Sequence, residues 1–187
     1  VGGLIGENSG TVNNCYSTGI VNGHGLGAWA GGLMGDNKGT VSNCYSTCTV
    51  SGDIDVGGLM GVNFGTIINS YSTGSVRETN YAGGLVGANR GNVSGCFWDV
   101  DTSGLATSDG GEGRTTADMQ KKSTFTGWDF VNIWYVQEGI DYPRLLWQVL
   151  VIDAPKGGEV LTAGSTYSIT WSSTDSISNV LIEYSTN

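Results

Sequence analysis

The sequence predicts an all-β protein whose main part is a parallel β-solenoid of four coils. Three features support this prediction: a repeat of about 26 residues, a strand-favouring content of Thr, Val and Tyr in each repeat, and Gly and Asn at fixed positions between the strands. A single coil of this kind cannot bury its apolar face alone, so neighbouring coils must stack. Stacked coils pair in parallel about 4.8 Å apart, so each column of equivalent residues becomes a ladder.

Several columns of the repeat keep one common register. In each column, successive members lie 29, 26 and 26 residues apart. The columns are Leu4, Leu33, Leu59 and Leu85; Asn8, Asn37, Asn63 and Asn89; Gly10, Gly39, Gly65 and Gly91; and Cys15, Cys44, Ser70 and Cys96. The shared register defines four repeats over residues 1–99.

The Asn and Gly columns predict how the chain turns between strands. We expect the Asn8 column at a corner, where side-chain amides hydrogen-bond from coil to coil. We expect the Gly10 column to supply positive φ at the same corner. The strand around Leu4 and Ile5 is apolar on both faces, which predicts a second layer packed outside the Ile5 column.

The segment after each corner predicts an aromatic ladder. Alternation places Cys15 and Ser17 on one face of the strand and Tyr16 on the other. With the small residues inward, Tyr16, Tyr45 and Tyr71 form an outward ladder; the opposite assignment remains open.

The cysteine column predicts free thiols. Cys15 and Cys44 should stack directly, at a Cα spacing that a disulfide could span. Side chains in one ladder point the same way, however, which favours buried thiols acting as small apolar groups.

The repeat units AGGLMGDNKGTVSNCYST and VGGLMGVNFGTIINSYSTG resemble the GLUG motif. That motif occurs in large bacterial and archaeal surface proteins and in some secreted peptidases. The resemblance covers residues 1–99 and implies an extracellular, cell-surface location. The fourth unit reads CFWD where the others read CYST or SYST, which places the end of the solenoid near Asp99.

Residues 100–149 are dense in aromatic side chains. The stretch STFTGWDFVNIWYVQEGIDYPRLLWQ resembles the segment that often follows these repeats. We expect it to cap the open coil or the Ile5 face, with a short helix from Thr116 that has Thr115 or Thr116 as its N-cap. The alternative is an aromatic ligand-binding surface.

Residues 150–187 predict a partial β-sandwich. Turn signals at 155–158 and alternating runs at 167–171 and 180–184 resemble the front half of an immunoglobulin-like or fibronectin-like module. Three strands cannot complete a sandwich of about seven, so the chain is expected to be a fragment.

Charge and hydropathy exclude two classes of partner. Lys and Arg total 8 against 17 acidic residues, a net charge of −9. Nucleic-acid binding needs a basic face to neutralise phosphates, so we predict no nucleic-acid partner. Because no apolar run approaches the roughly 20 residues of a membrane-spanning helix, we predict no span in this chain.

The residues do not assemble a recognisable catalytic motif, so we predict a non-enzyme. His24 is the only histidine and lies in a link between coils, where a solvated loop residue is expected. Glu7 and Asp36 share a column, which could bring two carboxylates together as in a glycosidase, but the next coils carry Val62 and Ala88 in that column.

Calcium is the one metal with candidate ligands. Asp99 and Asp101 begin a run that resembles an oxygen-ligand loop, with Gly104 at its sixth position. The twelfth position holds Gly110 in place of Glu, and a plain turn is the alternative. No other cofactor is expected.

The leading functional hypothesis is a non-catalytic extracellular structural or adhesin-like module. Its rigid solenoid would present loops to a cell-surface protein or matrix partner. A second hypothesis is glycan binding through exposed Tyr16, Tyr45 and Tyr71. A third is self-association into a filament or lattice through the open N-terminal edge of the solenoid.

Overall fold

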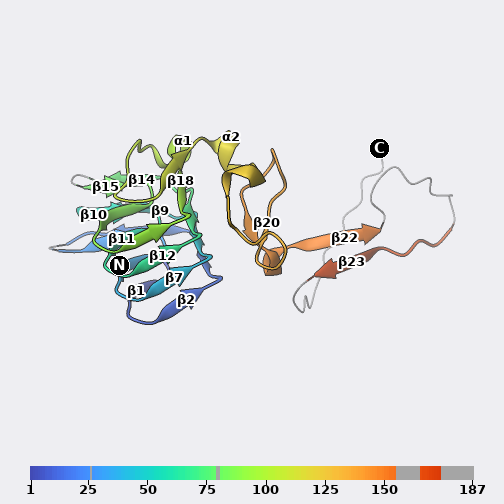
Figure 1. The fold of residues 1–187 in the computed structure, drawn as a ribbon, viewed down its shortest axis with the longest axis horizontal. Coiled ribbons are helices and arrows are strands. Elements are labelled where there is room, and N and C mark those ends of the chain that lie inside the picture. Colours follow the sequence, from blue (N-terminus) through green and yellow to red (C-terminus); the bar gives the residue numbers. More distant parts are fainter. Residues whose placement is uncertain (26, 79–80, 155–164, 174–187) are drawn as a thin grey trace.

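The computed structural model describes residues 1–25, 27–78, 81–154 and 165–173. The fold is all-β, as predicted, with parallel sheets stacked as a β-solenoid. Figure 1 shows the solenoid, then an irregular cap along one side of it, and then a pair of antiparallel strands that projects away. Among the described helices, none is long and apolar enough to cross a membrane.

Three long parallel sheets run through the solenoid. The first contains β1 (Ile5–Asn8), β6 (Met34–Asn37), β11 (Met60–Asn63) and β16 (Val86–Asn89). The second contains β2 (Thr11–Asn13), β7 (Thr40–Ser42), β12 (Thr66–Ile68) and β17 (Asn92–Ser94). The third contains β3 (Tyr16–Ser17), β8 (Tyr45–Ser46), β13 (Tyr71–Ser72), β18 (Phe97–Asp99) and β19 (Glu112–Arg114).

The links between coils form two shorter parallel sheets. One contains β4 (Ile20–Gly23), β9 (Thr49–Gly52) and β14 (Val76–Glu78). The other contains β5 (Trp29–Gly31), β10 (Ile54–Gly57) and β15 (Ala82–Gly83). The strand pairs of the three long sheets keep the register of the sequence columns, as in Met60 opposite Met34 and Val86, whereas the pair β5–β10 in the links shifts register between Ile54 and Val56.

The solenoid has about three turns, where the sequence predicts four coils. The fourth repeat contributes β16, β17 and β18. The chain then enters helix α1 (Val100–Ser103) instead of making another link strand. Strand β19 returns beside β18 and extends the third sheet beyond the last repeat.

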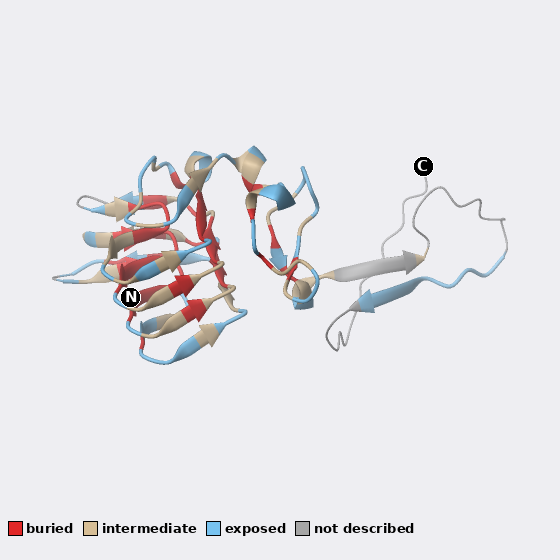
Figure 2. Cartoon of the chain, viewed as in Figure 1, coloured by how far each residue is buried: buried red, intermediate tan, exposed pale blue. Residues whose placement is uncertain are grey.

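The predicted outer layer over the Ile5 column is wrong. Leu33 and Met34 are adjacent in sequence, yet both are fully buried and belong to the same interior cluster. The chain bends at Gly32 and Leu33 before β6 begins at Met34, so both side chains enter one core. In Figure 2 the buried residues follow the inside of the solenoid.

The amide ladder is confirmed at the corner after the first sheet. Each asparagine donates from Nδ2 to Oδ1 of the next coil's asparagine, at 2.8 Å in all three steps from Asn8 through Asn37 and Asn63 to Asn89. Asn37 and Asn63 are fully buried. The ladder satisfies these polar groups inside the corner and fixes the register of the coils.

The predicted role of the Gly10 column is wrong. Positive φ instead occurs four residues later, at Asn14, Asn43, Asn69 and Gly95, with values of 52°, 52°, 47° and 60°. The glycines are needed for close stacking. A Cβ atom on Gly39 would lie 2.0 Å from the carbonyl oxygen of Gly10, and one on Gly65 would lie 2.0 Å from that of Gly39.

All four cysteines are free thiols, as predicted. Cys44, Cys48 and Cys96 are buried, and Cys15 is partly exposed. Burial raises the pKa of Cys44 and of Cys96 to about 12. Because the thiolate is the reactive form, these two thiols have low reactivity at neutral pH.

The cap is a compact, mostly irregular segment. It contains α2 (Thr116–Met119), a 3₁₀ turn at Lys122–Thr124, the antiparallel strands β20 (Trp134–Tyr135) and β21 (Arg144–Leu145), and a second 3₁₀ turn at Leu146–Gln148. The predicted helix start is confirmed, since the Thr115 side chain caps α2 by accepting from the backbone N–H of Asp118.

The described part of residues 150–187 is one antiparallel pair, β22 (Leu150–Ala154) with β23 (Thr170–Ser173). The predicted turn at 155–158 and the predicted strand at 180–184 lie outside the described residues.

Candidate binding groove between the tyrosine ladder and the cap

The tyrosine ladder forms on the outward face of the third sheet, as the alternation predicts. The rings of Tyr16 and Tyr45 stack with centroids 5.3 Å apart, and those of Tyr45 and Tyr71 stack at 5.0 Å with planes only 5° apart. On the inward face of the same strands, the Ser17 and Ser46 side chains are buried. In-register pairing of β3, β8 and β13 produces this stack directly.

The predicted exposure of the ladder is wrong for two of its three members. Tyr45 is 5% exposed and Tyr71 1% exposed. The cap packs over them, with the Trp134 ring tilted against both tyrosine rings at centroid distances of 6.2 and 6.0 Å. The cap thus covers the tyrosine face, and not the Ile5 face. Tyr16 remains only partly buried. The predicted covering of the open coil is confirmed, because residues 107–109 hydrogen-bond to the last coil between Gly84 and Asn89, and β19 pairs with β18.

The buried tyrosines keep their hydroxyl groups satisfied. The Tyr71 hydroxyl donates to the carbonyl oxygen of Pro143, and the Tyr45 hydroxyl donates to Oε1 of Gln148 at 3.0 Å. Burial raises the pKa of both phenols. Each tyrosine therefore contributes an apolar ring to the stack and a polar tip to the cap.

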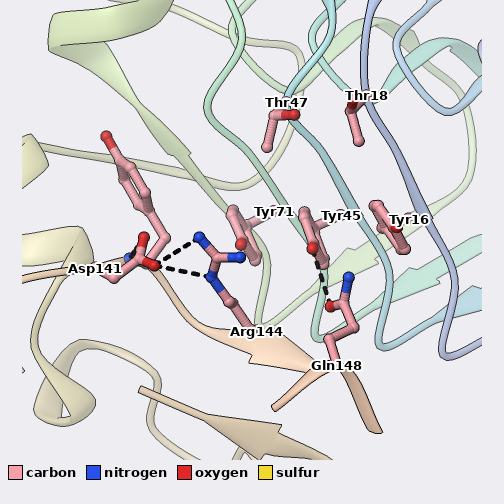
Figure 3. A pocket seen from close by; sticks show the side chains of 9 residues that line it. Tyr16, Thr18, Tyr45, Thr47, Tyr71, Asp141, Arg144 and Gln148 are labelled. Atoms are coloured by element: carbon pink, nitrogen blue, oxygen red, sulfur yellow. Dashed lines mark hydrogen bonds and ion pairs between the residues drawn. The ribbon is translucent and has the colours of Figure 1, made fainter. Parts of the chain in front are cut away.

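A groove of about 350 Å³ remains open where the cap meets the ladder (Figure 3). The solenoid wall consists of the tyrosines and the next outward column, and the cap wall comes from the segment around β21 and the following 3₁₀ turn. The lining residues are Tyr16, Thr18, Tyr45, Thr47, Tyr71, Asp141, Tyr142, Arg144 and Gln148.

The charged groups of the groove are paired with each other. Arg144 donates from Nε to Oδ2 of Asp141 at 2.8 Å, and a terminal nitrogen lies 2.7 Å from the same oxygen. The hydrogen bond to Asp141 raises the pKa of Arg144 above its ordinary value. Figure 3 shows the third guanidinium nitrogen directed toward the tyrosines.

Gln148 is held in one orientation. Its Oε1 accepts from the Tyr45 hydroxyl and from the backbone N–H of Leu145, at 3.0 and 3.1 Å. This arrangement leaves the amide nitrogen, which donates hydrogen bonds, facing the groove beside Tyr16 (Figure 3).

Trp147 packs beside Tyr16, next to the residues that line the groove. Its ring centroid is 5.9 Å from that of Tyr16, at an interplanar angle of 47°, and the side chain is 42% exposed. A second cavity of about 250 Å³ shares Asp141, Tyr142, Arg144 and Gln148 with the groove. These four side chains therefore line two adjacent spaces.

The two candidate calcium ligands, Asp99 and Asp101, both accept hydrogen bonds from within the protein. Asp99 is fully buried, and its carboxylate accepts four hydrogen bonds, from Asp101 N (2.8 Å), Thr102 N (3.2 Å), Thr116 Oγ1 (2.7 Å) and Tyr142 Oη (2.6 Å). Asp101 accepts from the Thr116 backbone. Asp99 caps helix α1 and joins it to Thr116 and Tyr142 of the cap. Across the described ranges, no cluster of three or more His, Cys, Asp or Glu gathers around one point.

The other titratable candidates are also engaged. Glu7 and Asp36 are register partners in the first sheet, and the Lys38 ammonium bridges them. His24 lies on an exposed link, with Nδ1 3.0 Å from a carboxylate oxygen of Asp53.

Most of the groove residues were not among the predicted site residues. The alternation that places Tyr16 outward places Thr18 on the same face, and Thr47 is its equivalent in the next coil. Nothing in the local sequence marks Asp141, Arg144 or Gln148, because their position depends on how the cap docks.

Comparison with known proteins gives no match to a protein-family model, to a curated protein or to a solved structure.

Proposed function

We propose that the chain is a non-catalytic, adhesin-like module of an extracellular surface protein. In this proposal the solenoid is a rigid support, and its links and the cap groove are the surfaces that meet a cell-surface or matrix partner. The observation that supports it best is the unbroken amide ladder from Asn8 to Asn89. A fully satisfied buried network of this kind stiffens the structure around it.

The surface location rests on the resemblance of the four repeats to the GLUG motif. The resemblance of residues 150–187 to an immunoglobulin-like or fibronectin-like module, a type common in surface proteins, points the same way. The thiol chemistry is compatible with an oxidising exterior. Cys44 and Cys96 are buried with a pKa of about 12, so they resist the oxidation that begins from a thiolate.

The non-catalytic part of the proposal rests on the state of the carboxylates. A general acid or base must be free to exchange a proton with a substrate. Lys38 pairs with Glu7 and with Oδ2 of Asp36, whose Oδ1 is buried without a hydrogen-bond partner among the described residues, and Asp99 accepts four hydrogen bonds.

Lysine labelling of intact cells tests the location. A membrane-impermeant amine reagent should modify the exposed Lys38 and Lys121 in intact cells that produce the protein, as read by mass spectrometry of their peptides. A cytoplasmic protein of the same cells serves as the control and should remain unlabelled. Labelling of Lys38 and Lys121 only after lysis would contradict an extracellular location.

A further inference from the structure

The groove beside Tyr16 offers an aromatic platform of a kind that the buried tyrosines cannot provide. Tyr16 is partly exposed and lines the groove, and the 42% exposed Trp147 packs beside it with the ring planes 47° apart, so the two rings form one aromatic surface at the edge of the groove. The C–H-rich face of a pyranose ring is apolar and flat, and it packs against such rings while its hydroxyls point elsewhere.

Polar groups surround this platform on both walls. Thr18 and Thr47 present exposed side chains from adjacent coils of the solenoid. Opposite them, the Gln148 amide nitrogen and the third guanidinium nitrogen of Arg144 are donors that face the groove (Figure 3). The threonine hydroxyls can donate and accept hydrogen bonds, and the Gln148 and Arg144 nitrogens donate them. Together these groups are complementary to the adjacent hydroxyls of a sugar ring, which also donate and accept.

The charge distribution selects a neutral ligand. Asp141 neutralises Arg144, so the groove carries no free positive charge from this pair. The chain as a whole has a net charge of −9, which repels anionic polymers. The volume of about 350 Å³ lies at the small end of the range for ligand pockets, which is roughly 300–1,000 Å³, and suits a short saccharide.

We infer that this groove binds a neutral oligosaccharide, with one sugar ring on Tyr16 and Trp147 and its hydroxyls bonded to Thr18, Thr47, Gln148 and Arg144. This oligosaccharide would be the ligand of the proposed adhesin-like module, and the inference rests on that proposed function for the extracellular location of the glycan. It differs from binding along an exposed tyrosine ladder, because Tyr45 and Tyr71 are covered by the cap.

Titration calorimetry on the intact chain tests the inference. The probes are cellobiose, maltose, lactose and mannobiose, with sialyllactose as the anionic comparison. We expect at least one neutral probe to bind with a Kd of about 1 mM or tighter, and sialyllactose to bind no better than lactose. Uniform blanks with the neutral probes, or binding of sialyllactose alone, would overturn the inference.

Variants locate the site. Thr47→Val removes a hydroxyl from the groove without changing the shape or strand preference of the side chain, and should weaken binding about threefold to tenfold. Thr40→Val, the same change on the outward face of β7, is the matched control and should leave the Kd unchanged. Trp147→Ala should weaken binding about tenfold. Equal affinity in Thr47→Val, Trp147→Ala and the unsubstituted chain would exclude this groove.

The two proposals fail separately. Surface labelling of Lys38 and Lys121 with no saccharide binding removes the glycan inference and keeps the surface module. Saccharide binding by a chain that is labelled only after lysis removes the surface location and keeps the groove.

Discussion

The hydroxyl of Tyr71, in the third coil, donates to the carbonyl oxygen of Pro143, in the cap. These residues are 72 positions apart in sequence, and the bond is buried. It joins the solenoid to a segment that has no repeat of its own. Together with the bond from Tyr45 to Gln148, it fixes the cap against the aromatic ladder and so shapes the groove.

Trp134 should be the main anchor of the cap. It is fully buried and contacts the rings of Tyr45, Tyr71 and Trp128. We expect Trp134→Ala to lower the free energy of unfolding by about 3–5 kcal/mol, because it leaves a large cavity. Trp147→Ala, at a 42% exposed position, is the control and should cost less than about 1 kcal/mol. Urea unfolding followed by circular dichroism measures both, and equal losses would contradict the anchoring role.

The interior of the amide ladder should be more sensitive than its end. Asn63→Ala leaves the amides of both Asn37 and Asn89 without their partner, so we expect a loss of about 2–4 kcal/mol in unfolding free energy. Asn8→Ala breaks one step and should cost about half as much. Asn13→Ala, on an exposed strand position, should be nearly neutral. The ranking can be read from urea midpoints, and a flat series would count against a cooperative ladder.

The glycine column provides a test with an internal control. An added Cβ at Gly65 meets the Gly39 carbonyl oxygen at 2.0 Å, whereas one at Gly10 meets nothing nearer than 3.9 Å. Gly65→Ala should therefore destabilise the chain by at least about 3 kcal/mol through forced separation of two coils. Gly10→Ala should be neutral or slightly stabilising. Thermal unfolding distinguishes the two, and tolerance of both would mean that the coils are not this closely stacked.

The bond between Tyr142 and Asp99 predicts a dependence on alkaline pH. Burial, and then the hydrogen bond to Asp99, raises the pKa of Tyr142 to about 12, above its ordinary value of 10.0. A raised folded pKa means that the stabilisation is fully present below pH 10 and is lost as the pH rises through 12. Tyr142→Phe should be less stable at pH 7 by about 1 kcal/mol, and this difference should shrink between pH 10 and 12.

The comparison with Tyr142→Phe is needed because the buried Cys44 and Cys96 also titrate above pH 9. Their contribution is common to both proteins and cancels in the difference. A gap between the two unfolding free energies that stays constant from pH 7 to pH 12 would contradict the assigned bond.

The repeat columns predicted the solenoid because their constant spacing places equivalent residues side by side on adjacent coils. The Asn8 column and the Tyr16 column became ladders as expected, since in-register stacking follows from the period. The prediction of positive φ at the Gly10 column was wrong, because the sequence does not distinguish a glycine needed for close packing of two backbones from one needed for positive φ. Positive φ occurs in the column Asn14, Asn43, Asn69 and Gly95, and Asn and Gly are residue types that tolerate the left-handed region of φ and ψ.

The burial of Tyr45 and Tyr71 could not be predicted from the same kind of pattern. It depends on Trp134 and Pro143 folding back from the cap, and those residues belong to no period. The aromatic density of residues 100–149 indicated that something is covered, but not which face. The sequence pattern also does not predict the position of Asp141, Arg144 and Gln148, since only docking of the cap brings them to the groove with Thr18 and Thr47.

The packing of the cap on the tyrosine ladder is tested most directly by nuclear Overhauser effects in the intact chain, with Tyr and Trp rings selectively labelled. The structure predicts cross-peaks from the ring protons of Tyr71 to those of Trp134 and Trp128, and from Tyr45 to Trp134. Tyrosine signals that show cross-peaks only to one another, with solvent-accessible rings, would contradict the docked cap and the groove that depends on it.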